Sequence, residues 1–181
     1  MISRLPFAAA FLPNQRADAD QYWIALGLIA AVDFVRLSLL GVGGSIFWPL
    51  IAFFVLAAHI NRLRHAGRRV DMAVVPLLVA WLVKFAAGVL AMTVAVLPVF
   101  LDMMREAGVD LDDPQAVNAA AYDPALQQAL SERLSTDGEL ARQIAEAGIW
   151  PSTWAFWIVI ALFALWYARL RPAIRRAPPR E

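Results

Sequence analysis

The sequence contains no cysteine and only two histidines. The absence of cysteine excludes disulfide bonds, thiol nucleophiles and thiolate metal ligands. The histidines, His59 and His65, lie on either side of a short polar stretch, and neither has a carboxylate or nucleophile at a spacing that suggests a catalytic set. We therefore expect no enzymatic activity, no catalytic residue, no metal site and no cofactor.

Charged residues are also scarce. They make up 17% of the 181 residues, whereas hydrophobic residues make up 61%. A soluble domain is about 45–50% apolar, so this chain needs lipid as its solvent. A helix requires about 20 apolar residues to cross the hydrocarbon core of a bilayer, and four segments are of this kind: 22–40, 45–60, 72–101 and 154–170. We expect an all-α, polytopic membrane protein with four transmembrane helices.

The connections between these segments indicate their arrangement. Gly41–Gly44 is a turn too short for a domain, so the first two helices should form an antiparallel hairpin. In the long polar segment 102–149, Asp113 and Asp123 each precede a proline, which is typical of a helix start. This segment should therefore contain short amphipathic helices.

The fourth transmembrane helix is expected to be separate from the polar segment. Gly148 is a candidate helix stop, and the aromatic residues Trp150, Trp154 and Trp157 suggest the belt that marks a membrane interface. At the other end of this helix, Trp166 and Tyr167 suggest the second belt.

The distribution of arginine predicts the orientation. Lysine and arginine accumulate in cytoplasmic loops, and segment 102–149 holds three arginines against ten acidic residues, whereas residues 61–71 and the C-terminal tail are basic. We expect a multi-pass protein of the bacterial inner membrane with both termini in the cytoplasm. The expected layout is a cytoplasmic or interfacial segment 1–21, three transmembrane helices 22–101 with a basic cytoplasmic loop 61–71, an acidic extracytoplasmic helical loop 102–149, a fourth helix 150–170 and a basic disordered cytoplasmic tail 171–181.

Three ionisable residues lie inside the expected spans: Asp33, Arg36 and Lys84. Such residues are rare in membranes and point to a functional site. Asp33 and Lys84 lie at similar depths and are candidates to pair, and Ala80, Ala87, Gly88 and Ala91 share the face of Lys84, where a neighbouring helix could approach closely. The group is either an ion relay or counter-ion site, or a buried ion pair of Asp33 and Lys84 that fixes helix register, with Arg36 either bonding Asp33 one turn away or snorkelling outward.

The basic loop has two interpretations as well. Arg62, Arg64, Arg68 and Arg69 lie within eight residues. They could bind anionic lipid headgroups or an acidic partner, at about 1 kcal/mol per basic residue, or they could serve only to set topology. Nucleic-acid binding is not expected, because a short loop at a membrane offers no element that reads a groove.

Two short stretches resemble domain-of-unknown-function family 805, a family of small bacterial inner-membrane proteins. The stretch Gln15–Trp23 keeps the first arginine and the Tyr-Trp pair of the element that precedes the family's first span, at Arg16, Tyr22 and Trp23. The stretch Asn61–Asp71 keeps Arg62, Leu63, Gly67 and Arg68 of its loop element. The resemblance implies an inner-membrane location and a general architecture, since the family has no defined activity.

The sequence therefore suggests two classes of function. The first is a non-enzymatic accessory subunit or assembly factor, which acts through a membrane-protein partner or a second copy of itself. The alternative is a small oligomeric transporter or channel component that uses the region of Asp33 and Lys84.

Overall fold

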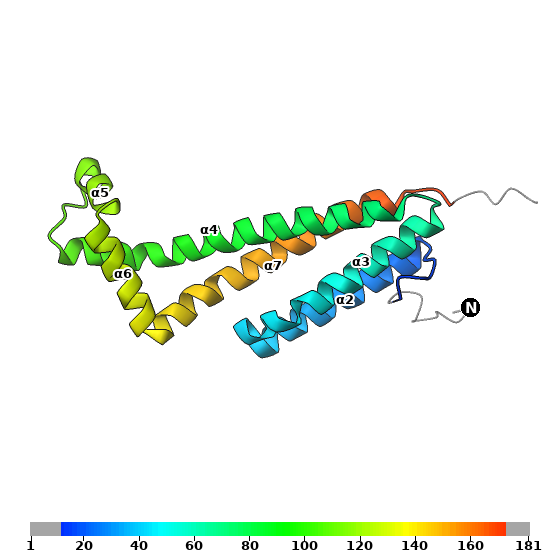
Figure 1. The fold of residues 1–181 in the computed structure, drawn as a ribbon, viewed down its shortest axis with the longest axis horizontal. Coiled ribbons are helices and arrows are strands. Elements are labelled where there is room, and N and C mark those ends of the chain that lie inside the picture. Colours follow the sequence, from blue (N-terminus) through cyan, green and yellow to red (C-terminus); the bar gives the residue numbers. More distant parts are fainter. Residues whose placement is uncertain (1–11, 173–181) are drawn as a thin grey trace, which may run out of the picture. The chain divides into compact units, whose positions relative to one another are not determined.

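The computed structural model describes residues 12–172, and over this range every regular element is a helix (Figure 1). Four helices are long and apolar enough to cross a bilayer: α2 (Ala19–Leu40), α3 (Trp48–His65), α4 (Val74–Glu106) and α7 (Gly138–Ala168). The predicted all-α polytopic fold is thereby confirmed. Residues 1–11 and 173–181 lie outside the described range, and with them lie half of the expected N-terminal segment and nearly all of the expected tail.

The chain divides into two compact units, and α4 and α7 contribute residues to both. Of the described residues, the first unit contains 12–83 and 154–172, and the second contains 84–153. In the first unit α2 and α3 lie side by side as the predicted antiparallel hairpin (Figure 1). The 3-10 helix Gly41–Phe47 connects them. The core of this unit includes Tyr22 of α2, Val55 of α3 and Ile160 of α7.

The start of α2 is specified by local sequence. The Asp18 carboxylate accepts a hydrogen bond from the Gln21 backbone N–H at 2.8 Å, and the Gln21 side chain accepts one from the Asp18 N–H at 3.2 Å. This reciprocal capping box satisfies two backbone donors that a helix start leaves without partners. The helix therefore begins three residues before the predicted span.

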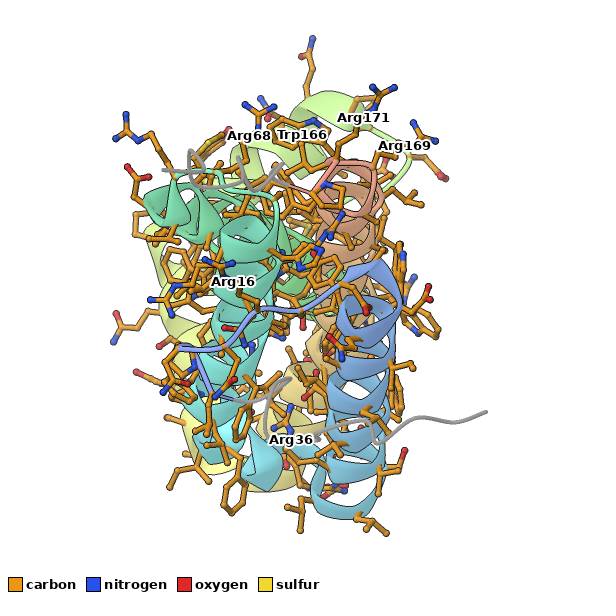
Figure 2. The ribbon with its side chains drawn as sticks, turned by 90° about the vertical axis from the view of Figure 1, so that its right-hand side faces the viewer. Arg16, Arg36, Arg68, Trp166, Arg169 and Arg171 are labelled. Atoms are coloured by element: carbon orange, nitrogen blue, oxygen red, sulfur yellow. The ribbon has the colours of Figure 1, made fainter. Side chains whose placement is uncertain are left out.

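The end of α3 corrects the predicted basic loop 61–71. The helix continues to His65, and Gly67 then adopts a φ of +62°, a left-handed conformation that glycine accepts without strain. The Arg68 N–H bonds the Leu63 carbonyl at 2.9 Å, and the Gly67 N–H bonds the Arg64 carbonyl at 3.2 Å, which is a Schellman motif. Arg68 emerges beside Trp166 of α7 (Figure 2). The loop proper is thus shorter than expected, because half of the arginine cluster is helical.

The second unit contains the two predicted short helices, α5 (Pro114–Ala121) and α6 (Pro124–Thr136). Asp113 and Asp123 cap them through hydrogen bonds of 2.9 Å from the Gln115 and Ala125 backbone N–H groups. The predicted use of these aspartates as caps is therefore confirmed.

The predicted helix stop at Gly148 is wrong, because α7 runs from Gly138 through this residue to Ala168. Gly148 is instead required for packing. A Cβ atom there would lie 2.9 Å from Met92 Cγ and 3.1 Å from the Gly88 carbonyl oxygen. Glycine at this position permits close contact between α4 and α7 in the second unit, on the face of α4 where small residues indicated a close neighbour.

Candidate functional site

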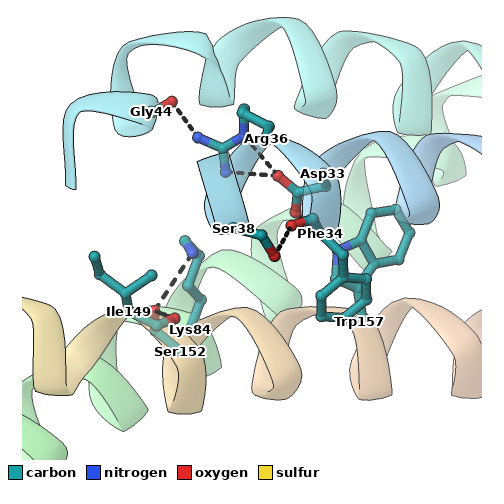
Figure 3. Close-up of polar contacts among 9 residues, drawn as sticks. All are labelled: Asp33, Phe34, Arg36, Ser38, Gly44, Lys84, Ile149, Ser152 and Trp157. Carbon is teal, nitrogen blue, oxygen red and sulfur yellow. Dashed lines mark hydrogen bonds and ion pairs between the residues drawn. The ribbon is translucent and has the colours of Figure 1, made fainter. Parts of the chain in front are cut away.

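Asp33 and Arg36 form a buried ion pair on α2. Their spacing of three residues places both side chains on one face of the helix, where only 2% of Asp33 and 8% of Arg36 are exposed. Arg36 donates to Asp33 Oδ1 from Nε at 2.9 Å and from Nη2 at 2.6 Å (Figure 3). The two charges thus neutralise each other within one turn, which is one of the two placements that the sequence left open for Arg36.

Two further contacts complete the cluster. Trp157 of α7 donates its indole N–H to Asp33 Oδ2 at 2.9 Å, and Arg36 donates from Nη1 to the Gly44 carbonyl (Figure 3). Gly44 lies so close that a Cβ atom there would be 3.2 Å from Arg36 Nη1. The ion pair therefore links α2, the hairpin turn and α7 inside the first unit.

Trp157 corrects the predicted aromatic belt. This residue is buried, whereas Trp150 and Trp154 are exposed. Because α7 continues N-terminally beyond the expected span, Trp157 lies well inside the helix rather than at its end. A tryptophan that buries its ring usually finds an acceptor for its indole N–H, and here the acceptor is the carboxylate of Asp33.

Lys84 has its own polar environment in the second unit. Its Nζ donates to Ser152 Oγ at 3.5 Å, and Ser152 Oγ donates to the Ile149 carbonyl at 2.8 Å (Figure 3). A Cβ atom at Gly88 would lie 3.4 Å from Ser152 Cβ, an ordinary contact distance, so this approach does not require glycine at position 88. These hydrogen bonds of Asp33 and Lys84 lie in different units, and the pairing of the two residues with each other stays a prediction.

The basic loop separates into one structural arginine and three exposed ones. Arg62 is 2% exposed and donates to three carbonyl oxygens at the end of α7: Tyr167 at 3.0 Å, Ala168 at 2.8 Å and Leu170 at 2.6 Å. It therefore caps the C-terminus of α7 and offers no guanidinium for lipid or partner. The prediction that Arg62 belongs to an exposed binding surface is wrong.

Arg64, Arg68 and Arg69 remain exposed. Arg69 forms an ion pair of 2.6 Å with Asp71, and the hydrogen bond between their side chains raises the pKa of Arg69 above its ordinary value. Its charge is thus partly neutralised at the surface. Arg64 and Arg68 carry the charge of the loop that is available for binding.

Sequence reasoning missed a cluster of buried polar residues next to Arg62. His59 lies between the rings of Tyr22 and Tyr167, with centroid distances of 5.6 Å and 5.4 Å. Asn61 is fully buried; its Oδ1 accepts from the Gln15 N–H at 3.1 Å, and its Nδ2 donates to the Leu12 carbonyl at 2.8 Å. The available signal was an amide and an imidazole near the end of an apolar helix, where polar groups need internal partners.

An apolar groove lies between α2 and α7 in the first unit, with a volume of about 320 Å³. Three of its lining residues are tryptophans and three are small. The lining consists of Trp23, Leu26, Gly27, Ala30, Trp154, Trp157, Ile158, Ile160 and Ala161. Its wall includes Trp157, so the buried ion pair supports one side of this groove.

Across residues 12–172, no group of three or more histidine, aspartate and glutamate side chains is placed to hold a metal ion. The side chains of Asp33, Arg62 and Asn61 form hydrogen bonds with other parts of the same chain, whereas the buried His59 Nε2 and Tyr22 hydroxyl have no hydrogen-bond partner among the described residues. Resemblance to domain-of-unknown-function family 805 remains a prediction. No family model, no curated protein and no solved structure matches the chain.

Proposed function

We propose that this protein is a non-enzymatic accessory subunit or assembly factor that contacts a transmembrane helix of another inner-membrane protein. The groove between α2 and α7 is the observation that carries the proposal. Small residues at helix surfaces in membranes let a second backbone approach closely, and Gly27, Ala30 and Ala161 supply them here. The tryptophans beside them offer large apolar contact areas at little cost in side-chain entropy.

Filling the groove should abolish association without harming the fold. A Cβ atom at Gly27 meets no heavy atom within 4 Å, so a side chain can start there without strain, and that of Gly27→Leu would extend into the groove. Removing a glycine from a helix interior also stabilises the helix by about 0.8–1 kcal/mol. We expect the variant to fold at least as well as wild type and to lose the partner that wild type retains during purification in mild detergent.

Val32→Phe is the matched control for this experiment. Val32 also lies on α2 but is 60% exposed and does not line the groove. This variant adds similar bulk to the outer surface of the same helix and should keep the partner. Retention of the partner by Gly27→Leu, or a solitary wild-type monomer under conditions that preserve other complexes, would contradict the proposal.

We place the N-terminus, the exposed arginine Arg64 and the C-terminus in the cytoplasm, and helices α5 and α6 on the opposite side. The asymmetric distribution of arginine supports this orientation. Because the chain has no cysteine, single cysteines at the exposed positions Arg64 and Gln128 can be labelled without background. Impermeant reagents should reach them from opposite sides of the membrane, and same-side labelling would overturn the four-span topology.

The alternative function is a small oligomeric transporter or channel component. Ionisable residues within apolar spans favour it, here the buried Asp33 and Arg36 in α2 and the partly buried Lys84 in α4. Since Asp33 and Arg36 neutralise each other, a relay through this site would have to break their ion pair in every cycle. Proton or ion flux in liposomes that contain correctly inserted protein tests this alternative, and an absence of flux over a range of gradients leaves it without support.

A further inference from the structure

A small cavity lies where the end of α3 meets the end of α7 in the first unit. Its volume is about 230 Å³, and its lining is Leu63, Arg68, Met72, Trp166, Tyr167 and Leu170. Arg68 is the single charged member of this set. The cavity is thus an apolar hollow with a guanidinium at its margin.

Further arginines flank this margin. Arg169 and Arg171 are exposed and lie on either side of Leu170, one of the lining residues. Figure 2 shows both near Arg68 and Trp166. Asp71, the acidic residue that follows Arg68 in the same loop, is occupied by its ion pair with Arg69. The rim of the cavity is therefore basic.

The end of a helix is ordinarily a poor place for an anion, because its unpaired carbonyl groups carry partial negative charge. Here Arg62 donates to the carbonyl oxygens of Tyr167, Ala168 and Leu170. These contacts neutralise the end of α7 from inside the protein. The buried arginine thus removes the repulsion that an anionic ligand would otherwise meet beside Leu170.

The size of the cavity limits the ligand further. Pockets that enclose a drug-sized molecule have volumes of about 300–1,000 Å³, so this one holds only part of a ligand, with the remainder outside. An arginine fork matches the oxygens of a phosphate group, and a half-exposed tryptophan at the end of a span is typical of the headgroup region. A phospholipid has both an acyl chain, which suits the apolar lining, and a phosphate next to it, which suits Arg68.

We propose that this cavity is a binding site for one anionic phospholipid. The start of an acyl chain lies among Leu63, Met72 and Leu170, and Arg68 holds the phosphate. Arg169 and Arg171 contribute positive charge around the headgroup. The site uses neither the groove of α2 and α7 nor its partner helix, so it stands independently of the proposed function.

Native mass spectrometry of the full chain in detergent tests the site. Phosphatidylglycerol should form a one-to-one adduct at concentrations where phosphatidylcholine with the same acyl chains does not. The triple variant Arg68→Gln, Arg169→Gln, Arg171→Gln should bind phosphatidylglycerol about a hundredfold more weakly, since each basic residue near an anionic lipid contributes about fivefold. If the triple variant fails to fold, Arg68→Gln alone tests the site, because Arg68 is exposed. This single variant should bind phosphatidylglycerol about fivefold more weakly.

The control variant removes the same number of charges elsewhere. The exposed residues Arg105 at the end of α4, Arg133 in α6 and Arg142 near the start of α7 serve for this. Their replacement by glutamine should leave phosphatidylglycerol binding unchanged. An equal loss in this control, or equal binding of the two lipids, would overturn the proposal.

Displacement by glycerol phosphate would show a site for free anions, and a doubled protein mass that excludes lipid would show that a second copy covers the cavity. Either result would also refute it.

Discussion

Replacing Arg62 with leucine is expected to lower the free energy of unfolding by about 4.5–9 kcal/mol, because hydrogen bonds from charged donors contribute about 1.5–3 kcal/mol each and three are lost together. Arg62 is buried and donates to three carbonyl oxygens at the end of α7. Leucine would leave these acceptors unsatisfied in a desolvated position. The contact between α3 and α7 at this end of the first unit should open.

Arg62→Lys and Arg64→Leu complete this experiment. Lysine keeps the charge but lacks the planar fork that reaches several acceptors at once, so it should recover only part of the lost stability. Arg64 is exposed, and its replacement should change stability little. Unfolding in denaturing detergent, followed by circular dichroism, measures all three. An Arg62→Leu variant as stable as Arg64→Leu would show that the cap contributes nothing.

Asp33→Leu is expected to destabilise the protein by about 3–5 kcal/mol, the usual cost of leaving one member of a buried ion pair without its partner. Arg36 would then remain buried with only the Gly44 carbonyl as an acceptor, and the Trp157 indole N–H would lose its acceptor. Replacing Arg36 with leucine as well removes the uncompensated charge. The double variant should regain most of the lost stability.

The same variants distinguish the two candidate partners of Asp33. If Arg36 is its partner, Asp33→Leu and Arg36→Leu should be strongly non-additive, whereas Asp33→Leu and Lys84→Leu should add. Coupling of Asp33 with Lys84 instead would revise the pairing seen in the first unit. Partner retention should be measured beside stability, because a double variant that folds but loses its partner would give the ion pair a role beyond packing.

Several features follow directly from the sequence because their causes are local. The length of the four hydrophobic segments alone predicts the spanning helices. In a membrane, only a helix forms all of its backbone hydrogen bonds within a single segment of chain. Asp113 and Asp123 each act on an N–H group two residues ahead, so their capping role is visible in a short window. The glycine-rich turn at Gly41–Gly44 and the pairing of Asp33 with Arg36 are likewise local.

Other features depended on the tertiary structure, because they join residues that are distant in sequence. Trp157 is 124 positions from Asp33, and Tyr167 is 105 positions from Arg62. Each of these residue types has two uses in a membrane protein. Tryptophan can anchor the interface and arginine can set topology, but both can also be buried hydrogen-bond donors. Glycine can end a helix or permit close contact between two helices. The sequence pattern is the same in both cases, and only the neighbour across the helix packing decides between them. By itself the sequence determined the helices and their caps, whereas the packing determined that Trp157 and Arg62 are buried donors and that Gly148 is a contact point.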